Sequence, residues 1–364
     1  MNQPADQIAR EIQQNGPMTL ARFMELALFS PGCGYYERQQ EIGQHGDFYT
    51  SVSVGSVFGE LLAFQFAAWL EKLPGFSIIE AGAHQGQLAA DILGWIRDFR
   101  GDVFDRLEYV LIEASPTRRA WQCQTLRPYL SQIRWIDRVE DLPFHGVKGV
   151  IFSNEFLDAT PAHRLGWDAM QRKWREWRIV VDSGKFSWSL GEMSSEAAAD
   201  VPKIPPELGA VLPDRFTVEI SPQARAWWKR AVERIDCGKL LMLDYGFTGE
   251  EWLQPKNAHG TLRGYAGHRV AEDPLANPGD QDLTAHVHFS ALQDVGEAAG
   301  FRTDGLAQSI FLTRIFEATQ KAPGGFAEWT SERVRQFQTL THPEHLGRSF
   351  RALVQSRLIG TSGP

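Results

Sequence analysis

The stretch SIIEAGAHQGQLAADIL, residues 77–93, decides how this chain folds. It begins as a short apolar strand, turns at two glycines, and continues with the apolar spacing of a helix. The same order recurs: LEYVLIEA (107–114) precedes a helical segment from Pro116, and VKGVIFSNE (147–155) is a further strand. Strands that alternate with helices of this length predict an α/β fold, a parallel sheet with helices on both faces.

The remaining segments are arranged around this domain. Residues 1–75 are predicted to form an N-terminal helical segment. Residues 76–320 form the domain, interrupted by insertions at about 162–215, where antiparallel strands are expected, and at about 247–290, where the chain is mostly irregular. Residues 321–364 are predicted to be a helical tail. The sequence therefore predicts one α/β domain with two insertions and helical ends.

Composition argues against several classes of protein. No run approaches the ~18 apolar residues of a membrane span. The net charge of −8 argues against a nucleic-acid partner, because phosphates need a basic face. The start, MNQPADQIAREIQQ, has neither the apolar core of a signal peptide nor the Arg-rich pattern of a transit peptide, which favours a cytoplasmic protein. Three scattered cysteines fit no metal spacing and no disulfide framework.

The turn at residues 80–86 matches one nucleotide-binding pattern better than another. The dinucleotide pattern G-x-G-x-x-G needs glycine at 82, 84 and 87, but the chain has Gly82, His84 and Gln87. In the pattern of S-adenosylmethionine (SAM) sites, E-x-G-x-G-x-G, Glu80, Gly82 and Gly86 match and only His84 departs. An ordinary strand–helix turn is the alternative. Histidine is among the residues that tolerate a positive φ, so His84 is compatible with a cofactor loop.

Acidic residues follow the next two strands. Glu113 ends the strand YVLIE, where a carboxylate can accept both ribose hydroxyls of an adenosine. Asp137 lies near the end of IRWID, a usual neighbour of an adenine ring. Each could instead be an ordinary solvated acid. Ligands of open α/β sheets bind outside the carboxyl ends of the strands, so acids at three successive strand ends, counting Glu80, favour a cofactor site.

Longer motifs run along most of the chain. They are GDFYTSVSVGSVFGE (46–60), SNEFLDATP (153–161), VEISPQA (218–224), LLMLDYG (240–246), GTLRGYAGHRVAEDPLANPGDQDLTAHVHFS (260–290) and GLAQSIFLTRIF (305–316). The chain thereby resembles the MidA-type SAM-dependent methyltransferases, which include the mitochondrial complex I assembly factor that methylates an arginine of a complex I subunit. Two departures are Val52-Ser53-Val54, where the family usually has a Pro-Glu pair, and His84 in the glycine loop.

The resemblance implies a Rossmann-like class I methyltransferase fold with SAM as the cofactor, and it implies site residues. Those expected to bind the cofactor are Thr50, Ser51, Glu80, Gly82, His84, Gly86, Glu113, Asp137 and Asn154. The catalytic candidates are Glu155, Asp158 and Glu219. Methyl transfer is an in-line displacement, so the protein mainly supplies alignment, and carboxylates can orient a guanidinium and localise its charge. Alternatively, Asp158 only caps the following turn.

No metal site is expected. His286 and His288 would share one face of an extended segment, but spacing fixes no third ligand, and methyl transfer from a sulfonium needs no metal. A hydrogen-bonded loop histidine or a histidine in a substrate channel is the preferred interpretation.

Three functions stay open at this point. The first, implied by the resemblance, is methyl transfer from SAM to an arginine of a protein, for example a subunit of a respiratory complex. The second is an O- or N-methyltransferase for a small molecule, with the insertions forming a closed pocket. The third is a non-catalytic SAM-binding assembly factor for a respiratory complex. Incubation with radiolabelled SAM in a lysate that lacks the protein would identify any acceptor.

Overall fold

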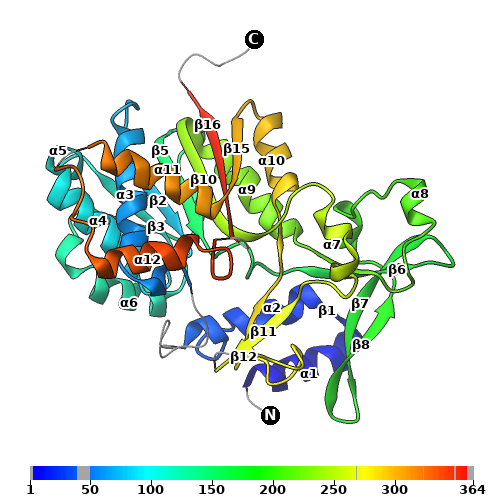
Figure 1. Cartoon of the computed structure of the whole chain (residues 1–364). Helices are drawn as coiled ribbons and strands as arrows, with labels where there is room; N and C mark the ends of the chain where they lie inside the picture. Colours follow the sequence, from blue (N-terminus) through cyan, green and yellow to red (C-terminus); the bar gives the residue numbers. More distant parts are fainter. Residues whose placement is uncertain (1–2, 39–49, 268, 323, 348–349, 359–364) are drawn as a thin grey trace.

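The protein is described by a computed structural model covering residues 3–38, 50–267, 269–322, 324–347 and 350–358. Residues 46–49, which belong to the first of the longer motifs, lie outside the described residues. Figure 1 shows a larger body of helices and strands beside a smaller one that is built largely from antiparallel strands.

A mixed β-sheet forms the centre of the larger body (Figure 1). Its strands are β2 (Ser77–Ala81), β3 (Glu108–Ile112), β4 (Ile133–Ile136), β5 (Val147–Asn154), β10 (Ile235–Phe247), β14 (Val287–His288), β15 (Arg302–Ala307) and β16 (Phe350–Arg357). The order is β15-β16-β10-β5-β2-β3-β4, and β14 pairs with the end of β10. Strands β2, β3, β4, β5 and β10 are parallel to their neighbours among this set, whereas β16 is antiparallel to both β10 and β15. The predicted α/β fold is confirmed.

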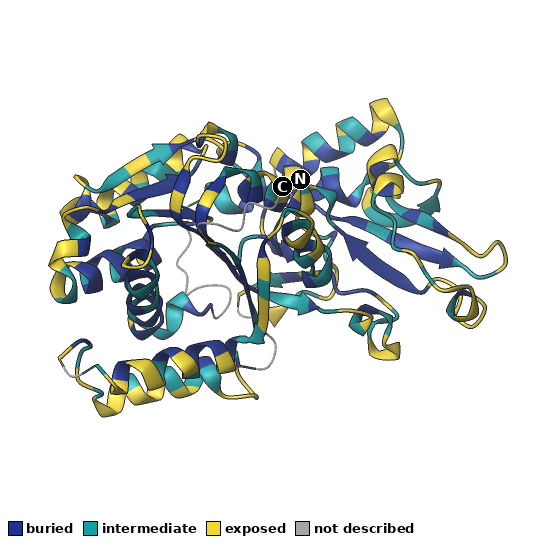
Figure 2. Cartoon of the chain, turned by 90° about the horizontal axis from the view of Figure 1, so that it is seen from above, coloured by how far each residue is buried: buried dark blue, intermediate teal, exposed yellow. Residues whose placement is uncertain are grey.

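Helices cover both faces of this sheet. On one face lie α3 (Val57–Leu70), α4 (Gln87–Phe99), α11 (Gln308–Gln320) and α12 (Ser331–Thr341); on the other lie α9 (Pro222–Arg234) and α10 (Phe289–Ala298). Helix α3 is buried on nearly every side, with Phe58, Leu62 and Phe66 fully enclosed. In Figure 2 the central strands are mostly buried, and exposed residues follow the outer faces of the helices. The core therefore consists of two apolar layers separated by the sheet.

The smaller body combines the N-terminus with the first insertion. Its sheet contains β1 (Met18–Thr19), β6 (His163–Asp168), β7 (Lys173–Asp182), β8 (Lys185–Gly191) and β9 (Thr217–Ile220), all paired antiparallel. Helices α1 (Gln3–Asn15) and α2 (Leu20–Phe29) pack against it. Thr19 caps α2 by accepting a hydrogen bond from the backbone N–H of Arg22 at 3.1 Å. The antiparallel strands expected in the first insertion are present.

The remaining elements are short. The second insertion, expected to be mostly irregular, contains a small sheet of β11 (Arg263–Ala266), β12 (Arg269–Val270) and β13 (Asp282–Thr284). The short helices are α5 (Gly101–Phe104), α6 (Pro116–Thr125), α7 (Ser195–Ala199), α8 (Pro206–Gly209), and the 3₁₀ turns η1 (Tyr35–Glu37), η2 (Val52–Val54), η3 (Arg127–Tyr129), η4 (Val139–Asp141), η5 (Glu251–Leu253) and η6 (Pro255–Asn257).

The C-terminal segment differs from the prediction of a helical tail over 321–364. It contains α12, as expected, but β16 follows and lies inside the central sheet between β10 and β15. The apolar run Ala352–Val354 is buried, and the polar Gln355 is buried as well. The mixed polar and apolar pattern of this segment does not predict a strand. The segment forms a strand because distant parts of the chain, β10 and β15, supply its hydrogen-bond partners.

Gln355 shows how β16 is held. Its Nε2 donates to the backbone carbonyl of Gln293 at 2.9 Å and to Thr303 Oγ1 at 3.0 Å, and its Oε1 accepts from Trp228 Nε1 at 2.9 Å. The side chain thus joins β16 to α9, α10 and β15. Trp228 and Gln355 are both buried, so the indole N–H of Trp228 depends on Gln355 for a partner.

We expect Gln355→Leu to lower the free energy of unfolding by roughly 1–3 kcal/mol, because it leaves the buried indole N–H of Trp228 without a partner. Urea denaturation measures the change. Gln338→Leu, the same substitution at an exposed position of α12, is the control and should stay within about 0.5 kcal/mol of the parent. Equal loss in both variants would show that the Gln355 network contributes nothing specific.

Candidate functional site

The glycine loop after β2 has the backbone geometry of a tight turn. Gly82 and Gly86 have φ values of 80° and 86°, and His84 between them has a φ of 45°. A Cβ on Gly82 would lie 2.8 Å from Cδ2 of Phe156, so only glycine fits there. Gly86 occupies the N-cap position of α4. His84 therefore holds a left-handed conformation of the kind that costs a non-glycine residue about 1–3 kcal/mol.

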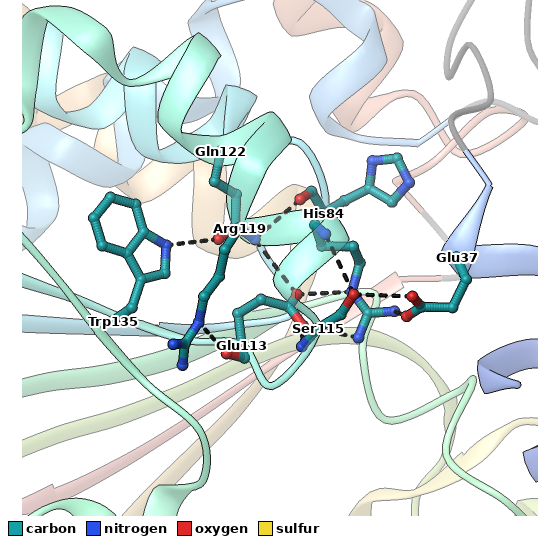
Figure 3. Close-up of polar contacts among 8 residues, drawn as sticks. Glu37, His84, Glu113, Ser115, Arg119, Gln122 and Trp135 are labelled. Atoms are coloured by element: carbon teal, nitrogen blue, oxygen red, sulfur yellow. Dashed lines mark hydrogen bonds and ion pairs between the residues drawn. The ribbon is translucent and has the colours of Figure 1, made fainter. Parts of the chain in front are cut away.

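His84 is held by neighbours from α6 (Figure 3). Its backbone carbonyl accepts a hydrogen bond from Gln122 Nε2 at 3.0 Å, and its ring centroid lies 6.1 Å from that of Trp121. Burial, with a smaller contribution from the positive charge of Arg118, lowers the pKa of His84 to about 4. The imidazole is therefore neutral near pH 7, and any hydrogen bond from it to a ligand lacks the strength that a charged donor would give.

Glu113, at the end of β3, is buried and already accepts several hydrogen bonds. Arg118 binds it through two donors, Nε to Oε2 and Nη2 to Oε1, each at 2.8 Å, and the Ser115 N–H donates to Oε1 at 2.8 Å. Arg118 also pairs with Glu37 of η1 at 3.1 Å, and Ser115 Oγ donates to Glu37 at 2.9 Å (Figure 3). These donors hold the carboxylate of Glu113 in place. Ribose hydroxyls that bind this carboxylate would do so beside the hydrogen bonds from Arg118.

The sequence analysis missed Arg118. Its only sequence signal was its position in the first turn of a helix that begins at Pro116, which brings the side chain back toward the preceding strand end.

Asp137 lies beside Glu113. Arg119 donates from Nη2 to Asp137 Oδ1 at 2.6 Å and from Nε to the backbone carbonyl of Glu113 at 2.7 Å. The side chain of Asp137 is 66% exposed. The structure thus brings these two predicted residues together through one arginine, and a contact of Asp137 with an adenine ring stays a prediction.

Glu80 faces the interior between strands. The Tyr109 hydroxyl donates to its Oε2 at 2.6 Å, and burial raises its pKa to about 7. A protein donor thus occupies one oxygen of the carboxyl group that was expected to accept from the ammonium group of SAM. That role stays a prediction.

A second group of polar residues lies at the end of β5. It consists of Asn154, Glu155 and, from the segment before α3, Ser51. Glu155 Oε1 accepts from the Ser51 N–H at 2.9 Å and from Asn154 Nδ2 at 3.1 Å. Glu155 has a φ of 47°, and burial raises its pKa to about 8. Thr50 stabilises the adjoining turn, because its Oγ1 accepts from the Ser53 N–H at 3.1 Å. These residues join the segment before α3 to the end of the central strand.

Asp158 lies in the turn that follows. Its Oδ1 accepts from the Ala159 N–H at 2.9 Å, the Tyr245 hydroxyl donates to its carboxyl group, and burial raises its pKa to about 6. Asp244, on β10, holds the backbone of this turn. Its Oδ2 accepts hydrogen bonds from the N–H groups of residues 156, 157 and 158 at 3.3, 3.1 and 3.3 Å. Asp244 and Asp158 thus both accept backbone hydrogen bonds of this turn, and a catalytic role for Asp158 stays a prediction.

Glu219, the third catalytic candidate, is held in β9. It pairs with Arg164, and its Oε2 accepts from the Thr261 N–H at 2.6 Å and from Thr261 Oγ1 at 3.0 Å. Its hydrogen bonds within the described part of the chain join the two insertions and include none to Glu155 or Asp158. Glu219 does line a cavity together with Asp158, so a catalytic role for it stays a prediction.

The residues at this edge suit SAM. Glu113 offers a buried carboxylate, and the buried Oδ1 of Asn154 has no hydrogen-bond partner among the described residues. Acceptors of this kind match the hydroxyl and ammonium donors of SAM. Within the same described part of the chain, no cluster of three His, Cys, Asp or Glu residues could hold a metal ion.

We expect Glu113→Gln to weaken binding of S-adenosylhomocysteine about tenfold or more, because ribose hydroxyls lose a charged acceptor. Isothermal titration calorimetry measures the affinity. Glu108→Gln, at the exposed opposite end of the same strand, is the control and should bind like the parent. If Glu113→Gln also binds like the parent, then Glu113 serves only to hold Arg118.

The raised pKa of Glu80 predicts a pH dependence of stability in the cofactor-free protein. Its pKa rises from an ordinary 4.5 to about 7 on folding, so the folded state binds the proton more tightly. The stabilisation is complete below pH 4.5 and is lost as the pH rises through about 7. Glu80→Gln cannot ionise, so between about pH 5 and about pH 8 it should lose roughly 1–3 kcal/mol less stability than the parent.

Urea denaturation at the two pH values measures this difference. Glu71→Gln, at an exposed position, should keep the pH dependence of the parent. A slope unchanged by Glu80→Gln would mean that Glu80 is ionised in the folded protein.

Comparisons with known proteins show the family to which the chain belongs. The family described as "Putative S-adenosyl-L-methionine-dependent methyltransferase" matches residues 61–307, well over half of the chain. Protein arginine methyltransferase NDUFAF7 homolog, mitochondrial, of Drosophila melanogaster is 28% identical, over 96% of this chain and 84% of its own length. Protein arginine methyltransferase NDUFAF7, mitochondrial, of Mus musculus is 29% identical, over 97% of this chain and 84% of its own length.

A solved structure is similar over nearly the whole chain. It is a Burkholderia thailandensis protein described as a "COG1565 superfamily member and likely methyl transferase" and bound to S-adenosyl-homocysteine. It has a TM-score of 0.81 and 28% sequence identity, and the alignment covers 99% of this chain and 92% of that chain. The expected class I methyltransferase fold is therefore confirmed.

The relatives also correct one prediction. Both curated relatives are named as mitochondrial proteins, so the cytoplasmic location predicted from the first residues of the sequence is wrong as an inference for this group of proteins. The physical reason is that the absence of a targeting pattern in one stretch says nothing about the compartment of the folded protein. Among the described residues, no helix is both long and apolar enough to cross a membrane.

The fold, the glycine loop and the relatives of the chain all identify the same family. The central sheet carries a glycine loop and anchored acids at the carboxyl ends of its strands, which is where α/β proteins bind ligands. The family match spans this sheet, and the similar solved structure holds the demethylated form of the cofactor. The cofactor is S-adenosyl-L-methionine, and the chain belongs to this family of S-adenosyl-L-methionine-dependent methyltransferases.

Proposed function

We propose that the protein transfers a methyl group from SAM to an arginine side chain of a protein substrate. The observation that carries this proposal is a pair of carboxyl groups at the end of β5, the half-buried Glu155 and the buried Asp158. Neither forms an ion pair with any Lys, Arg or His that the structure describes. Buried carboxylates normally have a cationic partner, and a guanidinium of the substrate would supply one.

The relatives support arginine as the acceptor. The Drosophila and mouse proteins are both named as protein arginine methyltransferases. Each is similar to this chain over most of its length.

The chemistry assigns a role to each carboxyl group. SAM, when bound, supplies an electrophilic methyl group on a positively charged sulfur. Glu155 and Asp158 orient the guanidinium through charge-assisted hydrogen bonds and localise its charge on the nitrogens that they contact. The remaining nitrogen keeps its electron pair for the in-line displacement, and a carboxylate accepts the proton that this nitrogen loses.

Neighbouring residues hold the two carboxyl groups in place. Ser51 and Asn154 fix Glu155 through hydrogen bonds to Oε1. The Tyr245 hydroxyl binds Asp158, and Asp244 holds the backbone of the turn on which Asp158 lies. The side chains are thus preorganised, which is the main contribution that a protein makes to a displacement reaction.

We expect Glu155→Gln and Asp158→Asn each to reduce methyl transfer at least about a hundredfold, because each removes a charge that orients the acceptor. Affinity for S-adenosylhomocysteine should change less than about threefold. Glu297→Gln, at an exposed position of α10, is the control and should keep the activity of the parent.

The acceptor is identified by incubating the protein with radiolabelled SAM in a lysate that lacks it, followed by amino-acid analysis of the labelled material. Label in methylarginine is the expected result. Label in a small molecule would contradict the proposal, and binding of SAM without any labelled product would favour the non-catalytic assembly factor. Equal loss of affinity and activity in the two variants would place Glu155 and Asp158 in the cofactor shell instead.

A further inference from the structure

A cavity of about 130 Å³ adjoins Asp158 on the side of the smaller body. It lies between the turn after β5, the start of α9, strand β14 and helix α10. Its charged and titratable lining consists of Asp158, Asp200, Glu219, Arg225, His286 and His288. The volume holds about four groups the size of a water molecule, which is the number of heavy atoms in a guanidinium.

Most charges around this cavity are already paired. Glu219 pairs with Arg164, and Asp200 pairs with Arg225. Asp158 forms no ion pair within the described residues, although the Tyr245 hydroxyl binds it. When Asp158 is ionised, the cavity therefore carries one uncompensated negative charge, which matches a single monovalent cation.

His286 adds an acceptor without charge. Its Nδ1 is buried and has no hydrogen-bond partner among the described residues. Its backbone N–H donates to Thr261 Oγ1 at 3.1 Å, and its ring centroid lies 5.4 Å from that of Tyr245 and 4.7 Å from that of Phe247. Burial lowers the pKa of His286 to about 4, so the ring is neutral near pH 7 and presents one acceptor nitrogen.

The second histidine of the pair has a different task. The ring of His288 bonds to the backbone carbonyl of Glu219, and its centroid lies 6.0 Å from that of Phe247 and 6.2 Å from that of Trp252. His288 therefore belongs to the wall of the cavity, whereas His286 brings an unused acceptor to it.

We propose that this cavity binds the guanidinium group of the acceptor, with Asp158 and His286 Nδ1 as the recognition groups in its lining and with Glu155 contacting the guanidinium from outside the lining. This inference rests on the proposed function and deepens it, because it adds His286 as a residue that determines specificity. A guanidinium is planar and carries five N–H donors in a fixed fork, so it can satisfy a carboxylate and a nearby imidazole at the same time. A lysine ammonium is compact and more strongly hydrated, and it suits this pair of acceptors less well.

Binding of methylguanidinium chloride tests the inference without knowledge of the protein substrate. The protein is labelled with ¹³C at histidine Cε1 and titrated in the presence of S-adenosylhomocysteine, and the His286 resonance is assigned by its loss in His286→Asn. We expect this resonance to shift on titration and to shift much less with methylammonium. His286→Leu should weaken methylguanidinium binding about tenfold or more, since it removes a hydrogen bond to a charged ligand.

Further variants serve as controls. His286→Asn keeps an acceptor near the position of Nδ1 and should retain most of the affinity. His345→Leu, the same substitution at an exposed histidine, should bind like the parent. Unchanged affinity for S-adenosylhomocysteine shows that His286→Leu is folded. If this variant does not fold, the resonance shift of the parent and the methylguanidinium affinity of His286→Asn still test whether His286 contacts the ligand.

The outcomes separate the two proposals. A His286 resonance that does not move at saturating methylguanidinium, or a His286→Leu variant that binds like the parent, overturns this inference whatever the protein methylates. Methylguanidinium binding through His286 together with label only in non-arginine products would overturn the proposed function and leave a cation-binding cavity.

Discussion

One buried carboxyl group, that of Asp244, sets the geometry of the candidate active site. A single oxygen of Asp244 accepts hydrogen bonds from the backbone N–H groups of residues 156, 157 and 158. Buried N–H groups require partners, so this acceptor draws the chain after β5 into a tight turn. Glu155 and Asp158 lie at the two ends of that turn, directly after the carboxyl end of β5. Without Asp244 the turn would have to find three other acceptors.

The same arrangement stores several acids in a small volume. Burial raises the pKa of Glu155 to about 8 and that of Asp158 to about 6, and burial together with the negative charge of Asp158 raises the pKa of Asp244 well above its usual range. A nearby cation lowers such pKa values again. Entry of a guanidinium and release of protons are therefore coupled in the proposed reaction. While no cation is present, the protonated carboxyl groups carry no charge, so the folded protein does not have to bury unpaired carboxylates.

Local sequence patterns were enough to predict the parallel strands of the central sheet and the glycine loop. Alternating strands and helices fixed the parallel part of the sheet, and the spacing of Gly82 and Gly86 located the cofactor loop. Strand β16 could not be found in this way, because its partners lie more than a hundred residues earlier in β10 and its buried polar residue, Gln355, is satisfied only by other elements. The pairing of Arg118 with Glu37 and Glu113 is likewise a contact between distant segments.

The position of β16 has a consequence for how the chain is made. Strand β16 follows the other strands of this sheet in the sequence and lies between β10 and β15, so the sheet can close only after the ribosome has made residues 350–357. Until then β10 presents an unpaired edge over the segment that β16 later covers, from Gly238 to Tyr245. Exposed edges of this kind pair readily with other chains. Synthesis of this protein therefore passes through a nascent state that is open to aggregation, and a chaperone or rapid release from the ribosome would protect it.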